Sequence, residues 1–139
     1  MIKKEIYIDT ISNEKLKKHT YFYDRNKIHK IHYKLNGKFH RSDGPACIFY
    51  YDNGKVEREL YFKNNKWHRE DAPAIIYYYK DGEIERKYYL LNDQLHRETG
   101  PACIFYYNDG SIERETYHIN GIECDVLQEI VIRGLEEKI

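Results

Sequence analysis

His40-Arg41-Ser42-Asp43-Gly44-Pro45-Ala46 is the first of three similar heptapeptides. The others are His68-Arg69-Glu70-Asp71-Ala72-Pro73-Ala74 and His96-Arg97-Glu98-Thr99-Gly100-Pro101-Ala102. They contain all three prolines of the chain, and the residue numbers 45, 73 and 101 give a period of 28. Self-similarity at a fixed period of this length is typical of stacked supersecondary units, none of which can bury its apolar face alone.

Two turn signals divide each period. The first comprises Asn53-Gly54, Asp81-Gly82 and Asp109-Gly110, pairs that adopt positive φ at little cost and favour two-residue hairpin turns. The second, with weaker turn chemistry, comprises Asn36-Gly37, Asn64-Asn65, Asn92-Asp93 and Asn120-Gly121. Two reversals per period predict two strands per unit. Residues 22–28 match residues 50–56, so a first, degenerate unit is expected to begin near residue 21.

The two strands of a unit are predicted to differ. Residues 55–63 alternate, with Arg58 on one face and Glu57 and Tyr61 on the other. The return segment, residues 66–80, is longer, and Pro73 cannot lie inside a central strand, so its surplus is expected to loop out. After each proline the chain is apolar at consecutive positions, as in a strand covered on both faces.

These patterns predict an all-β fold, an antiparallel meander of about four β-hairpin repeats of 28 residues, with a C-terminal capping helix. We expect one domain, residues 1–139: an N-terminal cap segment (1–20) containing a strand at 2–8, hairpin repeats (21–125) and the helix (126–139). The helix is indicated by Asp125 as N-cap and by helical spacing of the apolar residues Val126, Leu127, Ile130, Val131 and Leu135.

Composition restricts the function classes. Lys plus Arg and Asp plus Glu number 23 each, so no net charge attracts nucleic acid or anionic lipid, and both partners are disfavoured. No apolar run is long enough for a membrane span or a signal peptide. The three cysteines argue against a disulfide framework, and Cys47 and Cys103 share the repeat position of Ile75, as core residues would. We expect a cytoplasmic protein without a metal or cofactor.

The repeat resembles the variant class of MORN (membrane occupation and recognition nexus) repeats. The residues that carry the likeness are Tyr50-Tyr51-Asp52-Asn53-Gly54, Tyr33-Lys34-Leu35-Asn36-Gly37 and Phe39-His40, and it covers about residues 21–125. The chain departs from the usual motif in its longer period and in having His-Arg where His-Gly is common. The resemblance implies an array of antiparallel hairpins that acts as a binding module without catalysis. Similar proteins occur in bacteria, phage and large DNA viruses.

The histidines His40, His68 and His96 are candidate site residues. Equivalent residues of successive two-strand units lie roughly 9.5 Å apart, whereas zinc ligands need distances of about 2.1 Å, so one metal cannot gather them. We expect each histidine, with its arginine and the following acid, to close the loop before proline through side-chain to backbone bonds.

Arginine and tyrosine rows form the second candidate. Arg58, Arg86 and Arg114 either stack on neighbouring tyrosines and pair with a carboxylate from an adjacent strand, or present planar cations to an acidic partner or a phosphate. Tyr33, Tyr61, Tyr89 and Tyr117 recur on the more charged strand face, as contact residues or as cross-strand packing. Trp67, where other units have Phe39 and Leu95, is a further candidate partner-binding residue, although we expect it to pack at the core or edge.

The chain has no nucleotide-binding loop, nucleophile elbow or zinc-hydrolase motif, which predicts that it is not an enzyme. The leading hypothesis is a non-enzymatic protein-binding module whose tyrosine and arginine rows form the contact surface, with homo-oligomerisation left open. One alternative is a small phage- or virus-encoded inhibitor that occludes a host defence enzyme or sequesters its nucleotide signal. Another is a lipid-associated scaffold.

Overall fold

The computed structural model describes residues 1–125, which form strands and turns and contain no helix. The prediction of an all-β antiparallel meander is confirmed. The predicted helix, residues 126–139, lies outside the described residues. The strands are β1 (Ile2–Ile8), β2 (Lys15–Asp24), β3 (Lys27–Leu35), β4 (Lys38–Phe39), β5 (Cys47–Tyr50), β6 (Val56–Leu60), β7 (Phe62–Lys63), β8 (Lys66–Trp67), β9 (Ile75–Tyr78), β10 (Ile84–Tyr88), β11 (Leu90–Leu91), β12 (Gln94–Leu95), β13 (Cys103–Tyr106), β14 (Ile112–Ile119) and β15 (Ile122–Cys124).

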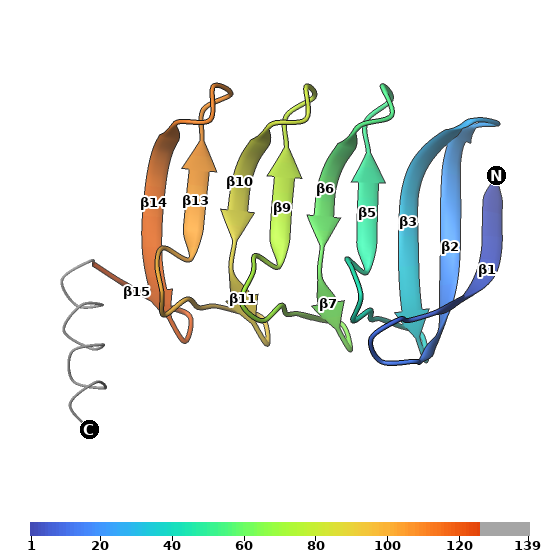
Figure 1. Cartoon of the computed structure of the whole chain (residues 1–139), viewed down its shortest axis with the longest axis horizontal. Helices are drawn as coiled ribbons and strands as arrows, with labels where there is room; N and C mark the ends of the chain where they lie inside the picture. The colour runs from blue at the N-terminus through green and yellow to red at the C-terminus, as the bar shows by residue number, and fades with distance from the viewer. Residues whose placement is uncertain (126–139) are drawn as a thin grey trace.

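One large sheet carries the architecture. Its strands follow the order β1-β2-β3-β5-β6-β9-β10-β13-β14-β15, every neighbouring pair is antiparallel, and β4 pairs with β3. The pairs β7-β8 and β11-β12 form separate small hairpins. Figure 1 shows the strands side by side along the long axis, with the N-terminus at one end of the row. Each strand therefore contacts mainly its neighbours in sequence, which is the arrangement that short hairpin connections produce.

The two turn classes are correctly located, but at the first signal the turn differs from the predicted two-residue type. At the first signal only the glycines Gly54, Gly82 and Gly110 have positive φ. The hydrogen bonds Gly54 N–H to Tyr51 C=O and Tyr51 N–H to Lys55 C=O define a longer loop with one left-handed residue. At the second signal both residues have positive φ, as in Asn64 (49°) and Asn65 (66°), which is the two-residue type I′ turn.

The reason for the longer loop lies in the side chain before the glycine. The Oδ1 of Asn53 accepts the Lys55 N–H at 2.9 Å, and Asp81 and Asp109 accept the N–H two residues on in the same way. This local bond gives the N–H two residues on an acceptor, without placing the Asn or Asp in the left-handed region. The glycine alone supplies the positive φ.

The segment between the small hairpin and the next long strand loops out, as predicted from Pro73. We name residues 40–46 the first loop, 68–74 the second loop and 96–102 the third loop. Each ends in an alanine with no exposed surface: Ala46, Ala74 and Ala102. The Ala74 N–H donates to Tyr88 C=O at 2.8 Å, and its own C=O accepts the Tyr61 N–H at 2.8 Å. A backbone bonded on both sides and fully buried leaves room only for a small side chain.

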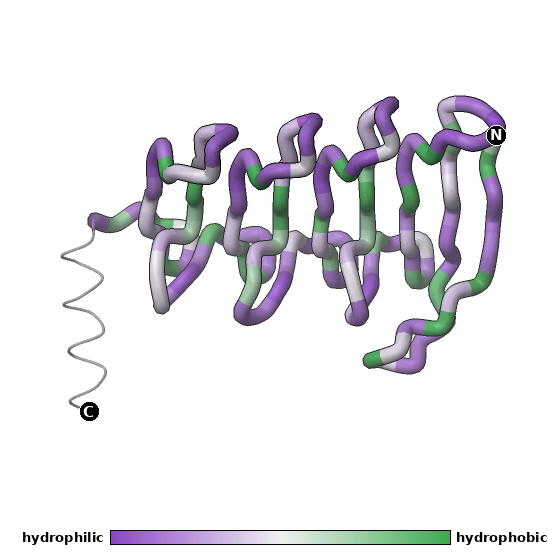
Figure 2. The backbone as a smooth tube through the Cα atoms, turned by 45° about the horizontal axis from the view of Figure 1, so that its top comes forward, coloured by the Kyte–Doolittle hydropathy of each residue, from purple (hydrophilic) through white to green (hydrophobic). Residues whose placement is uncertain are grey.

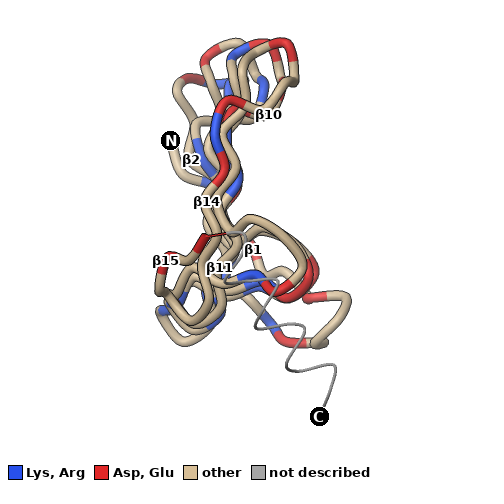
Figure 3. The backbone as a smooth tube through the Cα atoms, turned by 90° about the vertical axis from the view of Figure 1, so that its left-hand side faces the viewer, with Lys and Arg blue, Asp and Glu red and all other residues tan. Residues whose placement is uncertain are grey.

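Viewed end-on, the molecule is narrow at the middle of the strands and broader at the turns and loops above and below them (Figure 3). Viewed along the row of strands, Figure 3 shows a lobe of turns above and a larger lobe of hairpins and loops below, joined by the strands as a single layer. Figure 2 shows hydrophobic residues within the strands and hydrophilic residues at the turns. Cys47 and Cys103 are buried with 2% and 5% exposure, in agreement with the core role predicted for them.

The predicted N-terminal strand is confirmed as β1, which lies at the edge of the sheet. Leu16 on β2 has no exposed surface and forms a buried cluster with Ile31 and Tyr33. Tyr7 of β1 packs against this cluster, with ring centroids 5.1 Å from Tyr33. No helix within residues 1–125 is long and apolar enough to cross a membrane.

Candidate functional site

A row of alternating cationic and aromatic side chains crosses the sheet from β2 to β14. Each member is directly opposite the next in the strand register, which places all of them on one face. We name this row the ladder, and it comprises Tyr21, Lys30, Phe49, Arg58, Tyr77, Arg86, Phe105 and Arg114.

Every cation of the ladder lies over the aromatic ring of the preceding strand. The Arg58 Cζ is 3.9 Å from the Phe49 ring centroid, and the corresponding distance from Arg86 to Tyr77 is 4.1 Å. Arg114 lies 4.3 Å above Phe105, and the Lys30 Nζ lies 4.7 Å above Tyr21. Stacking on a ring fixes the plane of a guanidinium while leaving its edge available to an acceptor.

The ladder arginines have unused hydrogen-bonding capacity. The Nε atoms of Arg58 and Arg86 are buried and have no hydrogen-bond partner among residues 1–125. Their side chains are nevertheless 33% and 35% exposed, so the rest of each guanidinium reaches the surface. An arginine held flat and short of acceptors is suited to bind a carboxylate.

The carboxylates beside these arginines are not the ones expected. We predicted a partner from an adjacent strand, but the nearest acids are the preceding residues, Glu57 at 3.6 Å from Arg58 and Glu85 at 3.8 Å from Arg86. These residues sit where the strand register shifts at a bulge, which brings consecutive side chains toward one face. Both pairs are longer than a hydrogen bond and exposed, so they leave the cations largely available.

The structure places three of the predicted tyrosines in the lower lobe, away from the ladder. Tyr33 is only 4% exposed and Tyr61 is partly buried. The guanidiniums of Arg41, Arg69 and Arg97 cover the rings of Tyr33, Tyr61 and Tyr89, at 4.0, 3.9 and 4.0 Å. These rings support the loops and offer little contact area themselves. Tyr117, at the equivalent position of β14, pairs in register with Cys124 of β15.

The same arginines close their own loops. The Nη1 of Arg41, Arg69 and Arg97 donates to the carbonyl of Pro45, Pro73 and Pro101 at 3.1, 3.2 and 3.1 Å. The side-chain to backbone closure predicted for the loops is therefore present, and arginine provides it.

The histidines do something different from the predicted loop closure. The Nδ1 atoms of His40, His68 and His96 accept the N–H of Asn64, Asn92 and Asn120 at 3.2, 3.1 and 2.9 Å. Each bond joins one unit to the small hairpin of the next. The Nε2 atoms face carboxylates, at 3.0 Å from Glu14 for His40 and 3.4 Å from Glu98 for His96. The three histidines are thus separate links along the array, and no group of three metal-ligating residues occurs within residues 1–125.

Trp67 packs in the small hairpin β7-β8, in agreement with its predicted structural role. Its ring centroid lies 4.1 Å from that of Phe62, which in turn lies 5.4 Å from Phe39 of the preceding unit. The aromatic contacts continue to His32 on β3, 5.1 Å from Phe39. Trp67 therefore stabilises the stacking of the hairpins.

His32 makes stability dependent on pH. Burial, with smaller contributions from the charges of Lys30 and Lys34, lowers the pKa of His32 to about 4, from an ordinary value of 6.5. The folded state therefore favours the neutral ring, and the free energy of unfolding should fall as the pH drops from about 6.5 to about 4. In urea unfolding at pH 7 and pH 4.5, we expect His32→Phe to lose less stability between the two values than the wild type. Equal losses would contradict this assignment.

A second polar cluster joins the N-terminal segment to the first loop. Asp9 has no exposed surface, and its Oδ2 accepts the N–H groups of Ser42 and Asp43 at 2.6 and 3.2 Å. Its Oδ1 accepts the N–H groups of Ile11 and Ser12. Burial opposes ionisation, but these four donors outweigh it and lower the pKa of Asp9.

Asp43 is the other buried acid of this cluster. Its carboxylate accepts hydrogen bonds from the Arg41 Nε–H at 2.6 Å, the Thr10 N–H at 2.9 Å and the Tyr7 hydroxyl. Burial opposes ionisation here too, and the donors of Thr10, Tyr7 and Arg41 hold the pKa of Asp43 well below its usual range. The N-terminal segment is therefore fixed to the first loop by two ionised carboxylates.

Sequence reasoning named the ladder arginines but missed their aromatic partners. Phe49, Tyr77 and Phe105 recur at the 28-residue interval, so the period contained the signal. Only the strand register shows that each arginine lies opposite one of them. The roles of Asp9 and Asp43 had no signal in the repeat, because Asp9 precedes it and the equivalents of Asp43 are Asp71 and Thr99.

Comparisons of the chain with protein-family models, curated proteins and solved structures found no match.

Proposed function

We propose that this chain is a non-enzymatic protein-binding module, and that the ladder is the surface that contacts an acidic region of its partner. The observation that carries the proposal is the row of cations stacked on rings, with the Nε atoms of Arg58 and Arg86 left without acceptors among residues 1–125. A carboxylate of the partner would bind the exposed edge of each guanidinium, which the stacked ring holds in place.

The arrangement supports a protein partner for two further reasons. Aromatic and arginine side chains are enriched where protein interfaces have their largest energetic contributions, and the ladder consists of these types. The chain as a whole is neutral, so it lacks the net positive charge that non-specific binding to nucleic acid uses.

The ladder proposal is tested with a fluorescent polyglutamate peptide as the acidic probe, measured by anisotropy. We expect saturable binding that weakens as salt is raised, because exposed ion pairs are screened. In the double variant Arg58→Ala and Arg86→Ala, the affinity should fall about tenfold or more, since two charge-assisted contacts are removed.

The matched control removes two cations outside the ladder, Lys38→Ala and Lys66→Ala, which are exposed at the start of the short strands β4 and β8. This variant should bind the probe nearly as well as the wild type. Equal losses in both double variants would mean that net charge alone controls binding, and would refute a specific role of the ladder. Tighter binding of a single-stranded DNA oligonucleotide than of polyglutamate would overturn the assignment of a protein partner.

A further inference from the structure

The first loop shows what the equivalent loops can bind. Its backbone N–H groups at Ser42 and Asp43 point to one carboxylate oxygen, the Oδ2 of Asp9, which belongs to the N-terminal segment. Two consecutive N–H groups that converge on one acceptor form a concave anion site. Glu14 of the same segment lies 3.0 Å from the Nε2 of His40. The N-terminal segment therefore acts as a bound ligand of the first loop.

The third loop has the same donors without this ligand. Glu98 and Thr99 correspond to Ser42 and Asp43, and their N–H groups have no hydrogen-bond partner among residues 1–125. Arg97 repeats the stacking and proline bond of Arg41, but its Nε has no carboxylate partner because Thr99 replaces Asp43.

The local backbone is also preserved at the third loop. Gly44 and Gly100 both lie against the guanidinium of their loop, and a Cβ at Gly100 would be 3.0 Å from the Arg97 Nη1. The second loop has Ala72 at this position, and its Asp71 adopts a left-handed φ of 58°. The third loop is consequently the closer copy of the first.

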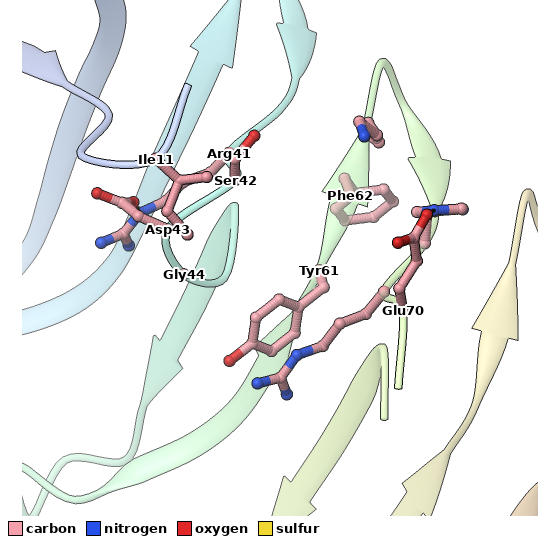
Figure 4. A pocket seen from close by; sticks show the side chains of 11 residues that line it. Ile11, Arg41, Ser42, Asp43, Gly44, Tyr61, Phe62 and Glu70 are labelled. Carbon is pink, nitrogen blue, oxygen red and sulfur yellow. Dashed lines mark hydrogen bonds and ion pairs between the residues drawn. The ribbon is translucent and has the colours of Figure 1, made fainter. Parts of the chain in front are cut away.

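Grooves lie beside these loops. One groove, of about 380 Å³, separates the first loop from the second and is drawn in Figure 4, where Tyr61 and Glu70 lie on the side opposite Asp43 and Gly44. An equivalent groove of about 330 Å³ separates the second loop from the third. Its lining includes Tyr89, His96, Arg97, Glu98 and Thr99. The N-terminal segment holds the corresponding place beside the first loop.

We propose that the third loop binds an aspartate side chain of a partner protein in this groove, through the backbone N–H groups of Glu98 and Thr99, as the first loop binds Asp9. The partner would present its aspartate at the start of a turn, like Asp9 before Ile11 and Ser12. Arg69 and Arg97 balance the carboxylates of Asp71 and Glu98 in the groove, and Tyr89 forms part of its wall. The site is separate from the ladder and does not depend on it.

The probe for this site is a synthetic peptide with the sequence of residues 7–14, capped at both ends, and a second peptide with Asn in place of Asp9. Amide nuclear magnetic resonance of the labelled, full-length protein reports each N–H group. The aspartate peptide should shift the Glu98 and Thr99 amides in a saturable way, and the asparagine peptide should shift them far less.

A gain-of-binding variant separates this site from damage to the fold. Glu98→Ser gives the third loop the residue that the first loop has at position 42, removes a negative charge and frees His96 for the peptide's glutamate. We expect the aspartate peptide to bind about two- to fivefold more tightly to this variant. The double variant Arg58→Ala and Arg86→Ala should leave the binding unchanged, which distinguishes this site from the ladder.

Three results would overturn the proposal. The first is equal shifts with the aspartate and asparagine peptides. The second is a set of shifts that avoids Glu98 and Thr99. The third is weaker binding by the Glu98→Ser variant when its thermal unfolding matches that of the wild type.

Discussion

Asp43→Asn is expected to lower the free energy of unfolding by about 3 kcal/mol, the effect of leaving a buried ionic partner uncompensated. The Asp43 side chain is 6% exposed and that of Arg41 is 13% exposed, so water cannot replace the lost charge. The neutral amide would also turn an NH₂ group toward donors at Thr10, Tyr7 or Arg41. Such a loss is a large fraction of the stability of a domain of this size.

Urea unfolding followed by circular dichroism measures this effect, and Asp71→Asn is the matched control. Asp71 occupies the same position in the second loop, is exposed and accepts no hydrogen bond from residues 1–125. Asparagine also tolerates its left-handed φ. We expect the control to change stability by less than about 0.5 kcal/mol. A similar loss in both variants would contradict the view that the N-terminal segment is fixed through Asp43.

Leu16→Ala is expected to cost about 2–5 kcal/mol, because it removes a completely buried side chain from the cluster with Ile31 and Tyr33. This cluster joins β2 to β3, and Tyr7 of β1 packs against it. The cavity would therefore form where the edge strand is attached. Amide exchange should increase first in β1 and β2, since β1, β2 and β3 supply most of this cluster and its surroundings, with Tyr50 of β5 also packed against it.

Leu16→Met is the volume-conserving comparison and should cost less than about 1.5 kcal/mol. Its thioether fills irregular space and keeps the site apolar. If the methionine variant were as unstable as the alanine variant, the shape of Leu16 rather than the cavity would be the cause. If neither variant lost stability, the cluster would not be the core of the N-terminal end.

The prediction of strands and reversals depended on local chemistry, and it succeeded where local chemistry decides the conformation. Asn-Gly and Asp-Gly pairs mark turns because their backbone tolerates positive φ. The turn type was wrong because the same local chemistry allows two solutions. The hydrogen bond that the Lys55 N–H donates to the Asn53 side chain favours the longer loop. At the second signal Asn64 and Asn65 both adopt positive φ and form the type I′ turn.

The candidate site could be predicted only in part. The period identified Arg58, Arg86 and Arg114 as equivalent residues, but it assigned their stacking partners to tyrosines in general. The bulges at Phe49/Tyr50 and at Phe105/Tyr106 fix the alignment of each strand pair, and that alignment places the arginines on Phe49, Tyr77 and Phe105. A bulge is fixed by how the two strands of a hairpin pair, which the period of the sequence does not show.

The sequence by itself determined the 28-residue period, the β-strands, the reversals between them and the neutral charge, because these follow from residue order and backbone preference. Tertiary structure alone decided that the ladder is continuous, that Tyr33 lies beneath Arg41, and that Asp9 binds the first loop. The contacts between neighbouring units of the ladder and from Asp9 to the first loop join segments that come together only when the β-strands pair. The physical reason is that the repeat determines which residues each unit contains, whereas packing determines which residues are in contact.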